Sequence, residues 1–335
     1  MLRLLAIALL IASVASQSRD ANEIYEEERL FNQYLRRYGL DVPQDADLKR
    51  WKANVVAKFK EIEEHNSAFR KGEELFEQEV NHFSHLSDEE FDNTLIKYER
   101  KGDEKEKIVD PVKAEDTKDL PEYFNWVDKG VVHGIQNQGG CGSCYAFAAI
   151  AAIECHACLY NNICDKLSEQ EALECAIGGC KGGYDRFIYS YTQEKTGATY
   201  SNYTYQQKPV NSCDDTKSRP RVPGTKVKEW IRMPNDVETI RYYLYNKGPM
   251  TIVFDVYENF PKYKRGIYSK AKGKIKGSHY VLLVGWGTEK GVDYWIYKNQ
   301  WGTTFGEQGY FRVIRGKDVA NIESYGPTYP ILESI

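Results

Sequence analysis

The stretch QNQGGCGSCYAF, residues 136–147, places Cys141 and Cys144 three residues apart in a run of small residues. Such a pair could be a redox couple, half of a zinc site, or a nucleophile beside a structural disulfide. The residues that follow are rich in Ala, without Gly or Pro up to Tyr160, which predicts a buried helix beginning at Ser143 and Cys144. Because a helix N-terminus lowers the pKa of a thiol placed there, Cys144 is a candidate nucleophile.

A nucleophilic thiol also needs a base for its proton and a third group that orients the base. His279 lies in SHYVLLVGWG, and Asn299 and Trp301 follow in YWIYKNQWG. The chain therefore contains the residue types of a Cys-His-Asn centre, widely separated in sequence.

Composition narrows the class of protein. The chain has 335 residues, 41% of them hydrophobic, and a net charge of −4, which does not favour nucleic acid as a partner. Residues 1–16 have a charged start, an apolar run and small residues, which predicts a secretory signal peptide rather than a membrane anchor. In an oxidising route most of the eight cysteines should form disulfides, which disfavours the zinc and redox interpretations.

Two regions differ in composition. Residues 20–119 are densely charged and carry apolar residues at helical spacing, which predicts an amphipathic helical segment. Residues 101–119 should be an exposed, cleavable connector. After a boundary near Leu120, strands are expected at residues 250–256, 280–284 and 294–298. These elements must bring His279 and Asn299 to the helix that begins at Cys144.

These motifs resemble the papain-like cysteine proteases, with cathepsin L-like and mite digestive members as the subgroup most like this chain. The resemblance runs from Leu120 to Pro330 and includes PEYFNWVDKG, LSEQEALEC, GCKGG and GPMTIVF. It implies an α+β fold of two lobes, with a helical first lobe, a β-barrel-like second lobe and an active-site cleft between them. It also implies a signal peptide (1–16), an inhibitory helical prosegment (17–119) and a mature peptidase domain (120–335).

The resemblance implies a role for each residue of the centre. Cys144 would be the nucleophile, His279 its imidazole partner and Asn299 the group that orients the imidazole. Gln138 would donate to the oxyanion, and Trp301 would shield the Asn-His contact from water. The reaction would be peptide-bond hydrolysis by an endopeptidase, without metal or cofactor.

Further positions follow from the same family pattern. Cys141 would bridge to Cys180 and Cys175 to Cys213. Cys155, Cys158 and Cys164 are additional to that pattern, and one further bridge among them is expected, with Cys158–Cys164 favoured over the other pairings and Cys155 left buried on the helix. The pocket for the substrate side chain two residues before the cut would comprise Tyr184, Asp185, Val253, Ser278, Tyr280 and Gly326. Because Tyr280 is bulky, we expect a preference for modest aliphatic side chains. Asn202 starts a glycosylation triplet.

Three departures from the family pattern leave an alternative open. Tyr145, Gln300 and Phe305 stand where the family has tryptophan, serine and tryptophan, so a weakly active or inactive binding protein of the same fold remains the alternative. The implied partners are protein or peptide substrates, the chain's own prosegment and cystatin-type inhibitors. We expect a secreted or endolysosomal monomer without a nucleic-acid partner or a membrane anchor, whose prosegment loosens when acid protonates carboxylates in its ion pairs.

Overall fold

The Ala-rich stretch forms the buried helix that its composition predicts. The computed structural model describes residues 22–99, 107–194, 198–199, 201–210, 213 and 219–335, so the expected signal peptide lies outside the described residues. Helix α5 (Cys144–Asn161) begins at the candidate nucleophile. Its residues 144–157 are all buried, because α5 packs against strands on one side and helix α7 (Asp185–Glu194) on the other.

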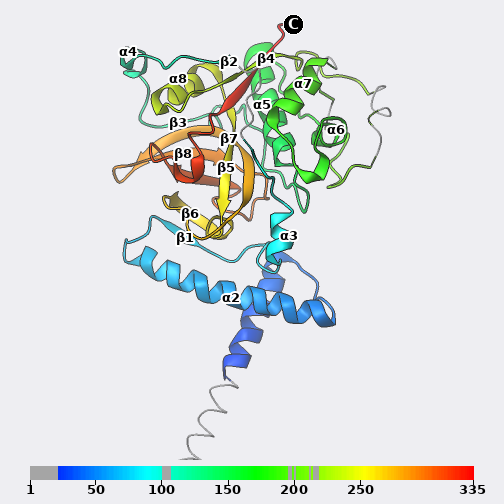
Figure 1. Cartoon of the computed structure of the whole chain (residues 1–335), viewed down its shortest axis with the longest axis vertical. Helices are drawn as coiled ribbons and strands as arrows, with labels where there is room; N and C mark the ends of the chain where they lie inside the picture. The colour runs from blue at the N-terminus through cyan, green and yellow to red at the C-terminus, as the bar shows by residue number, and fades with distance from the viewer. Residues whose placement is uncertain (1–21, 100–106, 195–197, 200, 211–212, 214–218) are drawn as a thin grey trace, which may run out of the picture.

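The first lobe is mainly helical, as expected (Figure 1). Besides α5 and α7 it contains α6 (Glu169–Cys175) and the 3-10 helix η1 (Gly179–Lys181). Ala149 and Ile153 of α5 pack with Ile188 and Tyr189 of α7 in one apolar cluster. The cluster holds the N-terminus of α5 in a fixed place at the junction of the lobes.

The second lobe is built on a ten-stranded sheet. Its strands are β1 (Phe76–Gln78), β2 (Lys107–Ile108), β3 (Phe124–Asn125), β4 (Val227–Arg232), β5 (Met250–Tyr257), β6 (Tyr263–Tyr268), β7 (Ile275–Glu289), β8 (Val292–Lys298), β9 (Tyr310–Ile314) and β10 (Thr328–Leu332). The order is β1-β6-β9-β8-β7-β5-β10-β4-β2, with β3 on β7. Helix α8 (Val237–Lys247) and the 3-10 helices η3 (Phe260–Lys262) and η4 (Val319–Asn321) complete the lobe. The three expected strands are confirmed as β5, β7 and β8.

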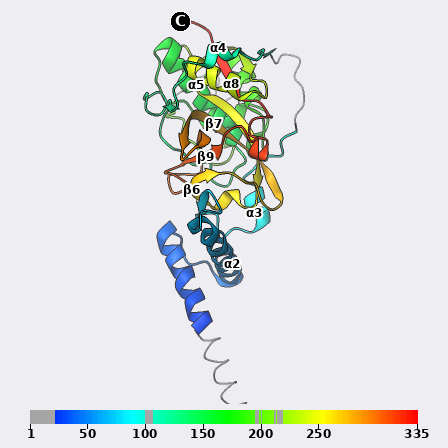
Figure 2. The ribbon, with the colours of Figure 1, turned by 90° about the vertical axis from the view of Figure 1, so that its left-hand side faces the viewer.

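The prosegment is helical where its periodicity predicts. Residues 22–38 form a helix, and α2 (Asp45–Arg70) lies beside it (Figure 2). Val55 and Ile62 of α2 pack with Phe31 and Tyr34 in a small separate core. A short helix, α3 (Asp88–Asp92), follows and begins with a capping box at Ser87.

The prosegment also supplies both ends of the sheet path. Strand β1 (Phe76–Gln78) pairs antiparallel with β6, and β2 (Lys107–Ile108) pairs parallel with β4. The described part of the connector, 107–119, is largely exposed as expected, but it contains β2 and the short helix α4 (Ala114–Thr117). Residues 107–119 are thus more structured than their charge suggests, because the edge of β4 pairs with β2.

Three disulfides join the expected pairs of cysteines, Cys141–Cys180, Cys158–Cys164 and Cys175–Cys213. Cys144 and Cys155 are free and buried. Because the two C-x-x-C units contribute to separate disulfides, they do not combine into one zinc site.

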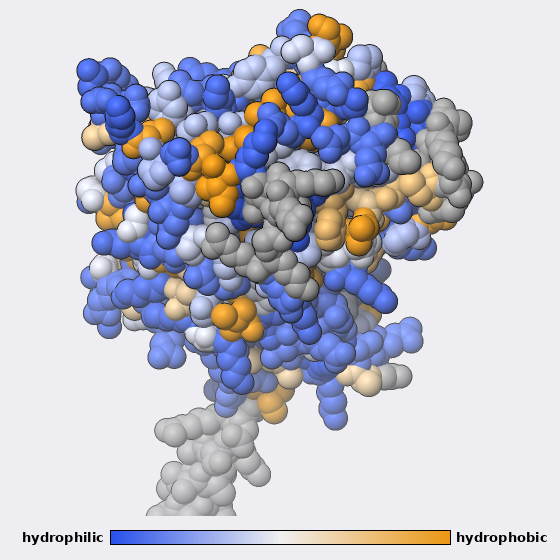
Figure 3. All heavy atoms as spheres, turned by 45° about the horizontal axis from the view of Figure 1, so that its top comes forward, coloured by the Kyte–Doolittle hydropathy of each residue, from blue (hydrophilic) through white to orange (hydrophobic). Residues whose placement is uncertain are grey.

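The surface gives no sign of a membrane span in the part of the chain that is described. No helix there is both long and apolar enough to cross a bilayer. The face in Figure 3 is mostly hydrophilic, with its hydrophobic side chains in small groups. Scattered exposed apolar residues of this kind are ordinary for a folded protein.

Candidate active site

The fold brings His279, Asn299 and Trp301 together on the second lobe. His279 lies on β7 and Asn299 directly follows β8, and His279 Nε2 is 2.8 Å from Asn299 Oδ1. The indole of Trp301 stacks on the imidazole, with ring centroids 4.5 Å apart. None of the three side chains has measurable exposure. If Nε2 donates to Asn299, the other ring nitrogen, Nδ1, is left as an acceptor.

Cys144 approaches this group from the first lobe. The backbone N–H of Tyr280, the residue after His279, acts to lower the pKa of the Cys144 thiol, so the thiol lies beside the imidazole strand. Nδ1 of His279 has no hydrogen-bond partner among the described residues. The thiol and the imidazole therefore share the junction of the lobes without a hydrogen bond between them.

Burial keeps both groups neutral in this state. Burial raises the pKa of the Cys144 thiol to about 12, although neighbouring backbone N–H groups act in the opposite direction. Burial also lowers the pKa of His279 to about 4, against the opposing effect of the Asn299 hydrogen bond. The helix N-terminus that favours a thiolate is thus outweighed while the cleft excludes water.

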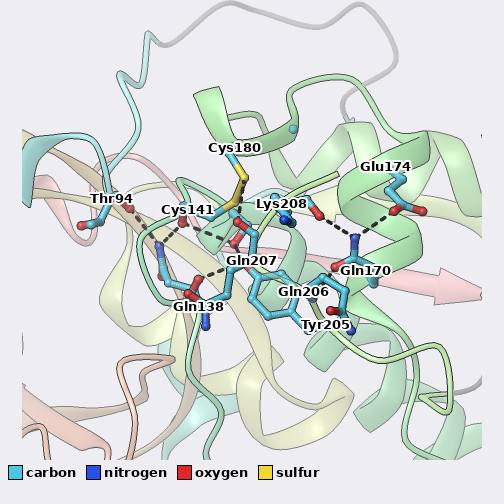
Figure 4. Close-up of a disulfide and its surroundings, with 12 residues drawn as sticks. Thr94, Gln138, Cys141, Gln170, Glu174, Cys180, Tyr205, Gln206, Gln207 and Lys208 are labelled. Carbon is cyan, nitrogen blue, oxygen red and sulfur yellow. Dashed lines mark hydrogen bonds between the residues drawn. A yellow bond between two sulfur atoms is a disulfide. The ribbon is translucent and has the colours of Figure 1, made fainter. Parts of the chain in front are cut away.

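Gln138 holds a peptide carbonyl from the prosegment. Its Nε2 donates to the carbonyl oxygen of Thr94 over 2.8 Å and to that of Cys141 over 2.9 Å (Figure 4). The loop that carries Gln138 is fixed by the Cys141–Cys180 disulfide and by the Tyr205 hydroxyl, which donates to the Gln138 carbonyl over 2.9 Å. This geometry can polarise a carbonyl oxygen close to the start of α5.

The expected pocket is occupied by the prosegment. Ile96 exchanges two backbone hydrogen bonds with Ser278, of 3.0 and 2.7 Å, and belongs to one buried apolar cluster with Val253 and Tyr280. Two residues further on, the ring of Tyr98 contacts three tyrosine rings, those of Tyr184, Tyr280 and Tyr325. The prosegment thus extends along the line of the predicted pocket residues.

A buried carboxylate lies behind the pocket wall. Asp185, at the start of α7, accepts from the Tyr280 hydroxyl over 3.2 Å, from Thr251 over 2.7 Å and from Thr328. Tyr280 is therefore held rigidly between the pocket and a charged group.

Another expected pocket position, Gly326, has a φ of 74°, and a Cβ there would lie 2.6 Å from the Met233 carbonyl oxygen, so only glycine fits without rearrangement.

Tyr145 fits the site without displacing it. Its hydroxyl donates to the Gly179 carbonyl over 3.2 Å, and its ring lies so close to Gly183 that a Cβ there would be 2.7 Å from it. Phe305 packs edge-on against Trp301, with centroids 4.8 Å apart. These two departures from the family pattern are accommodated by glycine and aromatic packing.

Sequence reasoning missed two contributors to the site. Tyr325 packs on the prosegment beside Gly326, and the side chain of Gln300 lies against the His279 strand. The position of Tyr325, directly before a pocket residue, was a usable signal. The contact between the Gln300 side chain and the His279 strand could not be predicted, because it depends on where β7 and β8 separate. Asn202, outside the cleft, is exposed.

Comparison with known proteins agrees with this geometry. Residues 120–330 match the papain family cysteine proteases, and residues 31–91 match the cathepsin propeptide inhibitor domain (I29). The chain is 32% identical to a cathepsin L-like peptidase of Aedes aegypti (95% of this chain, 98% of the relative) and 28% identical to cathepsin S of Bos taurus (97% and 98%). The solved structure of a recombinant stem bromelain precursor superimposes with a TM-score of 0.80 at 29% identity (92% and 100%).

Proposed function

The chain belongs to the papain family of cysteine proteases and is a cysteine endopeptidase made as a proenzyme, and from this premise we propose that Cys144, His279 and Asn299 are its catalytic residues. The observation that supports this most strongly is the hydrogen bond from Gln138 to the Thr94 carbonyl. It supports the proposal because Gln138 already donates to a peptide carbonyl, as it would to the carbonyl of a substrate.

The proposed reaction is acyl transfer through a thioester. The Cys144 thiolate attacks the carbonyl carbon, and the oxygen accepts hydrogen bonds from Gln138 Nε2 and the Cys144 backbone N–H. The His279 imidazolium gives its proton to the leaving amine as the C–N bond breaks. Water then gives a proton to His279 and attacks the thioester, which releases the acid and restores the thiolate-imidazolium pair. Asn299 holds the imidazole ring in place throughout.

The prosegment inhibits by covering the site and by keeping it uncharged. Thr94 and Ile96 fill the carbonyl and side-chain positions, and the dry cleft favours the neutral thiol and imidazole. Once the prosegment leaves, water enters the cleft and the helix N-terminus can stabilise the thiolate. Removal of the prosegment therefore both opens and charges the centre.

A peptide epoxide that alkylates active thiols tests this assignment. We expect labelling of the mature enzyme at Cys144 and little labelling of the proenzyme, with loss of labelling and of activity in Cys144→Ala. Cys155→Ala is the matched control, because Cys155 is the other free buried cysteine, and it should keep both. A folded mature protein that stays unlabelled would instead indicate the inactive binding protein.

For substrate choice we propose a preference for modest aliphatic side chains two residues before the cut. Tyr280 limits the pocket, and the prosegment presents Ile96 to it. A peptide library cleaved by the mature enzyme should be led by Val, Ile or Leu at that position. A profile led by Phe or Arg would contradict the proposal.

We further propose how the chain is divided and where it acts. Residues 1–16 would direct it to the secretory route, residues 17–119 would be removed, and residues 120–335 would act as a monomer in a secreted or endolysosomal setting. Cystatin-type proteins would compete for the same cleft, and Asn202 is exposed as glycosylation requires. N-terminal sequencing of the matured enzyme tests the boundary directly.

A further inference from the structure

Gln300 occupies a buried position between the catalytic residues. Its side chain is 4% exposed. Its Nε2 donates to the carbonyl oxygen of Tyr280 over 2.6 Å and lies 3.4 Å from His279 Nε2. A serine, which the family pattern has at this position, is two heavy atoms shorter and could not span the same gap directly.

Beyond the end of the β7–β8 pairing, the side chain of Gln300 takes the place of a backbone hydrogen bond between the two strands. Strands β7 and β8 pair antiparallel up to Leu282 and Lys298, and the same register continued by two residues on each strand would place Tyr280 opposite Gln300. There the backbone of Gln300 turns to other partners. Its side-chain amide, rather than its peptide N–H, bonds to Tyr280.

Those other partners belong to the reaction centre. The Gln300 N–H donates to Asn299 Oδ1 over 2.9 Å, and the Gln300 carbonyl accepts from the backbone N–H of Gln138 over 2.9 Å. One residue thus bonds to the orienting amide, to the oxyanion residue and to the strand of the imidazole.

The orientation of the amide is settled by its partner. The Tyr280 carbonyl can only accept, so the Gln300 NH₂ group must face it and the amide oxygen must point away. The same NH₂ group then lies beside His279 Nε2. Since Nε2–H already donates to Asn299, the two N–H groups lie side by side, each with its own acceptor.

We propose that Gln300 is a positioning residue, which fixes His279 relative to Gln138 and whose amide hydrogens disfavour protonation of the imidazole. This inference rests on the proposed function. The groups that face His279 are Phe254 of β5, Trp301, Asn299 and, from α5, Cys144, of which only the Cys144 thiol titrates. Beside the thiol and the Asn299 hydrogen bond, the Gln300 amide is therefore a further local influence on the imidazolium.

The test compares Gln300→Ser and Gln300→Glu with the unaltered mature enzyme, with rates expressed per epoxide-titrated active site. In Gln300→Ser we expect the alkaline limb of the kcat/KM profile to move up by about half a pH unit to one unit. We also expect kcat to fall about tenfold with KM changed less than about threefold. In Gln300→Glu the alkaline limb should move further up, because a carboxylate favours the imidazolium.

Gln193→Ser is the matched control. Gln193 also donates to a backbone carbonyl over 2.6 Å, that of Lys228, but it lies on α7 and not in the cleft. The control should keep the wild-type pH profile even if it loses stability. If Gln300→Ser and Gln300→Glu lose only stability, with pH profiles and kcat per active site like those of the control, the inference is overturned.

The two proposals fail in different ways. An unaltered mature enzyme that neither reacts with the epoxide nor cleaves peptides would refute the proposed function. An active unaltered enzyme whose alkaline limb is the same in both Gln300 variants would refute only the role of Gln300.

Discussion

At the scale of single residues, the pocket is defined by the pairing of Tyr280 with Asp185. In the proposed pocket the tyrosine ring takes up space that would accept a larger substrate side chain, and its hydroxyl is one of three hydroxyl donors to Asp185, which is only 3% exposed. We therefore propose that Tyr280 both narrows the pocket and covers the Asp185 side chain.

Replacing Tyr280 should separate these two effects. In Tyr280→Ala the pocket enlarges and Asp185 becomes accessible. For substrates with Phe or Arg two residues before the cut, we therefore expect kcat/KM to rise at least about tenfold relative to substrates with Val there. Tyr280→Phe keeps the bulk and removes only the hydroxyl. It should keep the aliphatic preference and lose about 1 kcal/mol of stability. Peptide-library profiles and thermal unfolding provide the measurements, and an unchanged profile in Tyr280→Ala would show that Tyr280 does not limit the pocket.

At the scale of elements, the segment between β1 and α3 contains a histidine whose protonation we expect to weaken inhibition by the prosegment. Both ring nitrogens of His82 are buried without a hydrogen-bond partner among the described residues, and burial lowers the pKa of His82 to about 4. The next residue, Phe83, packs edge-on against Trp301 over the active site. Protonation of His82 would therefore disturb the part of the prosegment that covers the imidazole.

The pH window follows from these values. Between pH 6.5 and about 4 the docked prosegment keeps His82 neutral, whereas a released and hydrated His82 takes up a proton. Falling pH in that window therefore favours release. Glu77 protonates only at lower pH, because hydrogen bonds from Arg265 and Lys264 hold its pKa below the ordinary value although burial would raise it. His82 therefore promotes release of the prosegment at a higher pH than the ion-paired carboxylate of Glu77 does.

Replacing His82 with phenylalanine should weaken this response. We expect His82→Phe proenzyme to mature several-fold to about tenfold more slowly than wild type near pH 5, with a deficit at least as large near pH 4 and little difference near pH 7.5. The measurement is loss of full-length chain over time at a series of pH values. His133→Gln, in the mature domain, serves as the control and should follow wild type. Equal rates for His82→Phe and wild type at all pH values would exclude the histidine from the response.

The elements also show what sequence can and cannot predict. Helix α5 and strands β5, β7 and β8 were predictable because composition and periodicity are local properties. Strand β2 was not, because its formation depends on the edge of β4, more than a hundred residues away. For the site, residue types and motif order indicated Cys144 and His279. The burial that keeps these two residues neutral arises only when distant segments pack together. The same is true of the contacts of Gln300 with Tyr280 and His279.

At the scale of the whole molecule, opposite charges join the prosegment to the mature domain. Residues 17–119 contain 27 Asp and Glu against 18 Lys and Arg, and residues 120–335 contain 22 against 26. Ion pairs cross between them in a group around β1, β6 and the start of β7: Lys262–Glu61, Lys264–Glu77, Arg265–Glu77, Lys272–Glu74, Lys276–Asp88 and Lys276–Asp92. Because many of these side chains are partly exposed, salt should screen them.

We therefore expect maturation at constant pH to speed up with added salt. Glu77→Gln, which removes the partner of both Lys264 and Arg265, should mature about two- to fivefold faster at low salt and depend less on salt. Glu63→Gln is the control, because Glu63 pairs with Arg70 inside the prosegment. Salt-independent maturation of the unaltered proenzyme would show that these pairs do not hold the prosegment.

The prosegment meets the sheet at two separate ends, through β1 on β6 and β2 on β4. While the chain is whole, an end that detaches stays near its partner strand at an effective concentration in the millimolar range or thereabouts, so it rebinds readily. One peptide bond cleaved in the connector changes that situation without altering any contact. The inhibitor is then a separate molecule, its rebinding depends on its bulk concentration, and dilution alone drives the enzyme toward the active form.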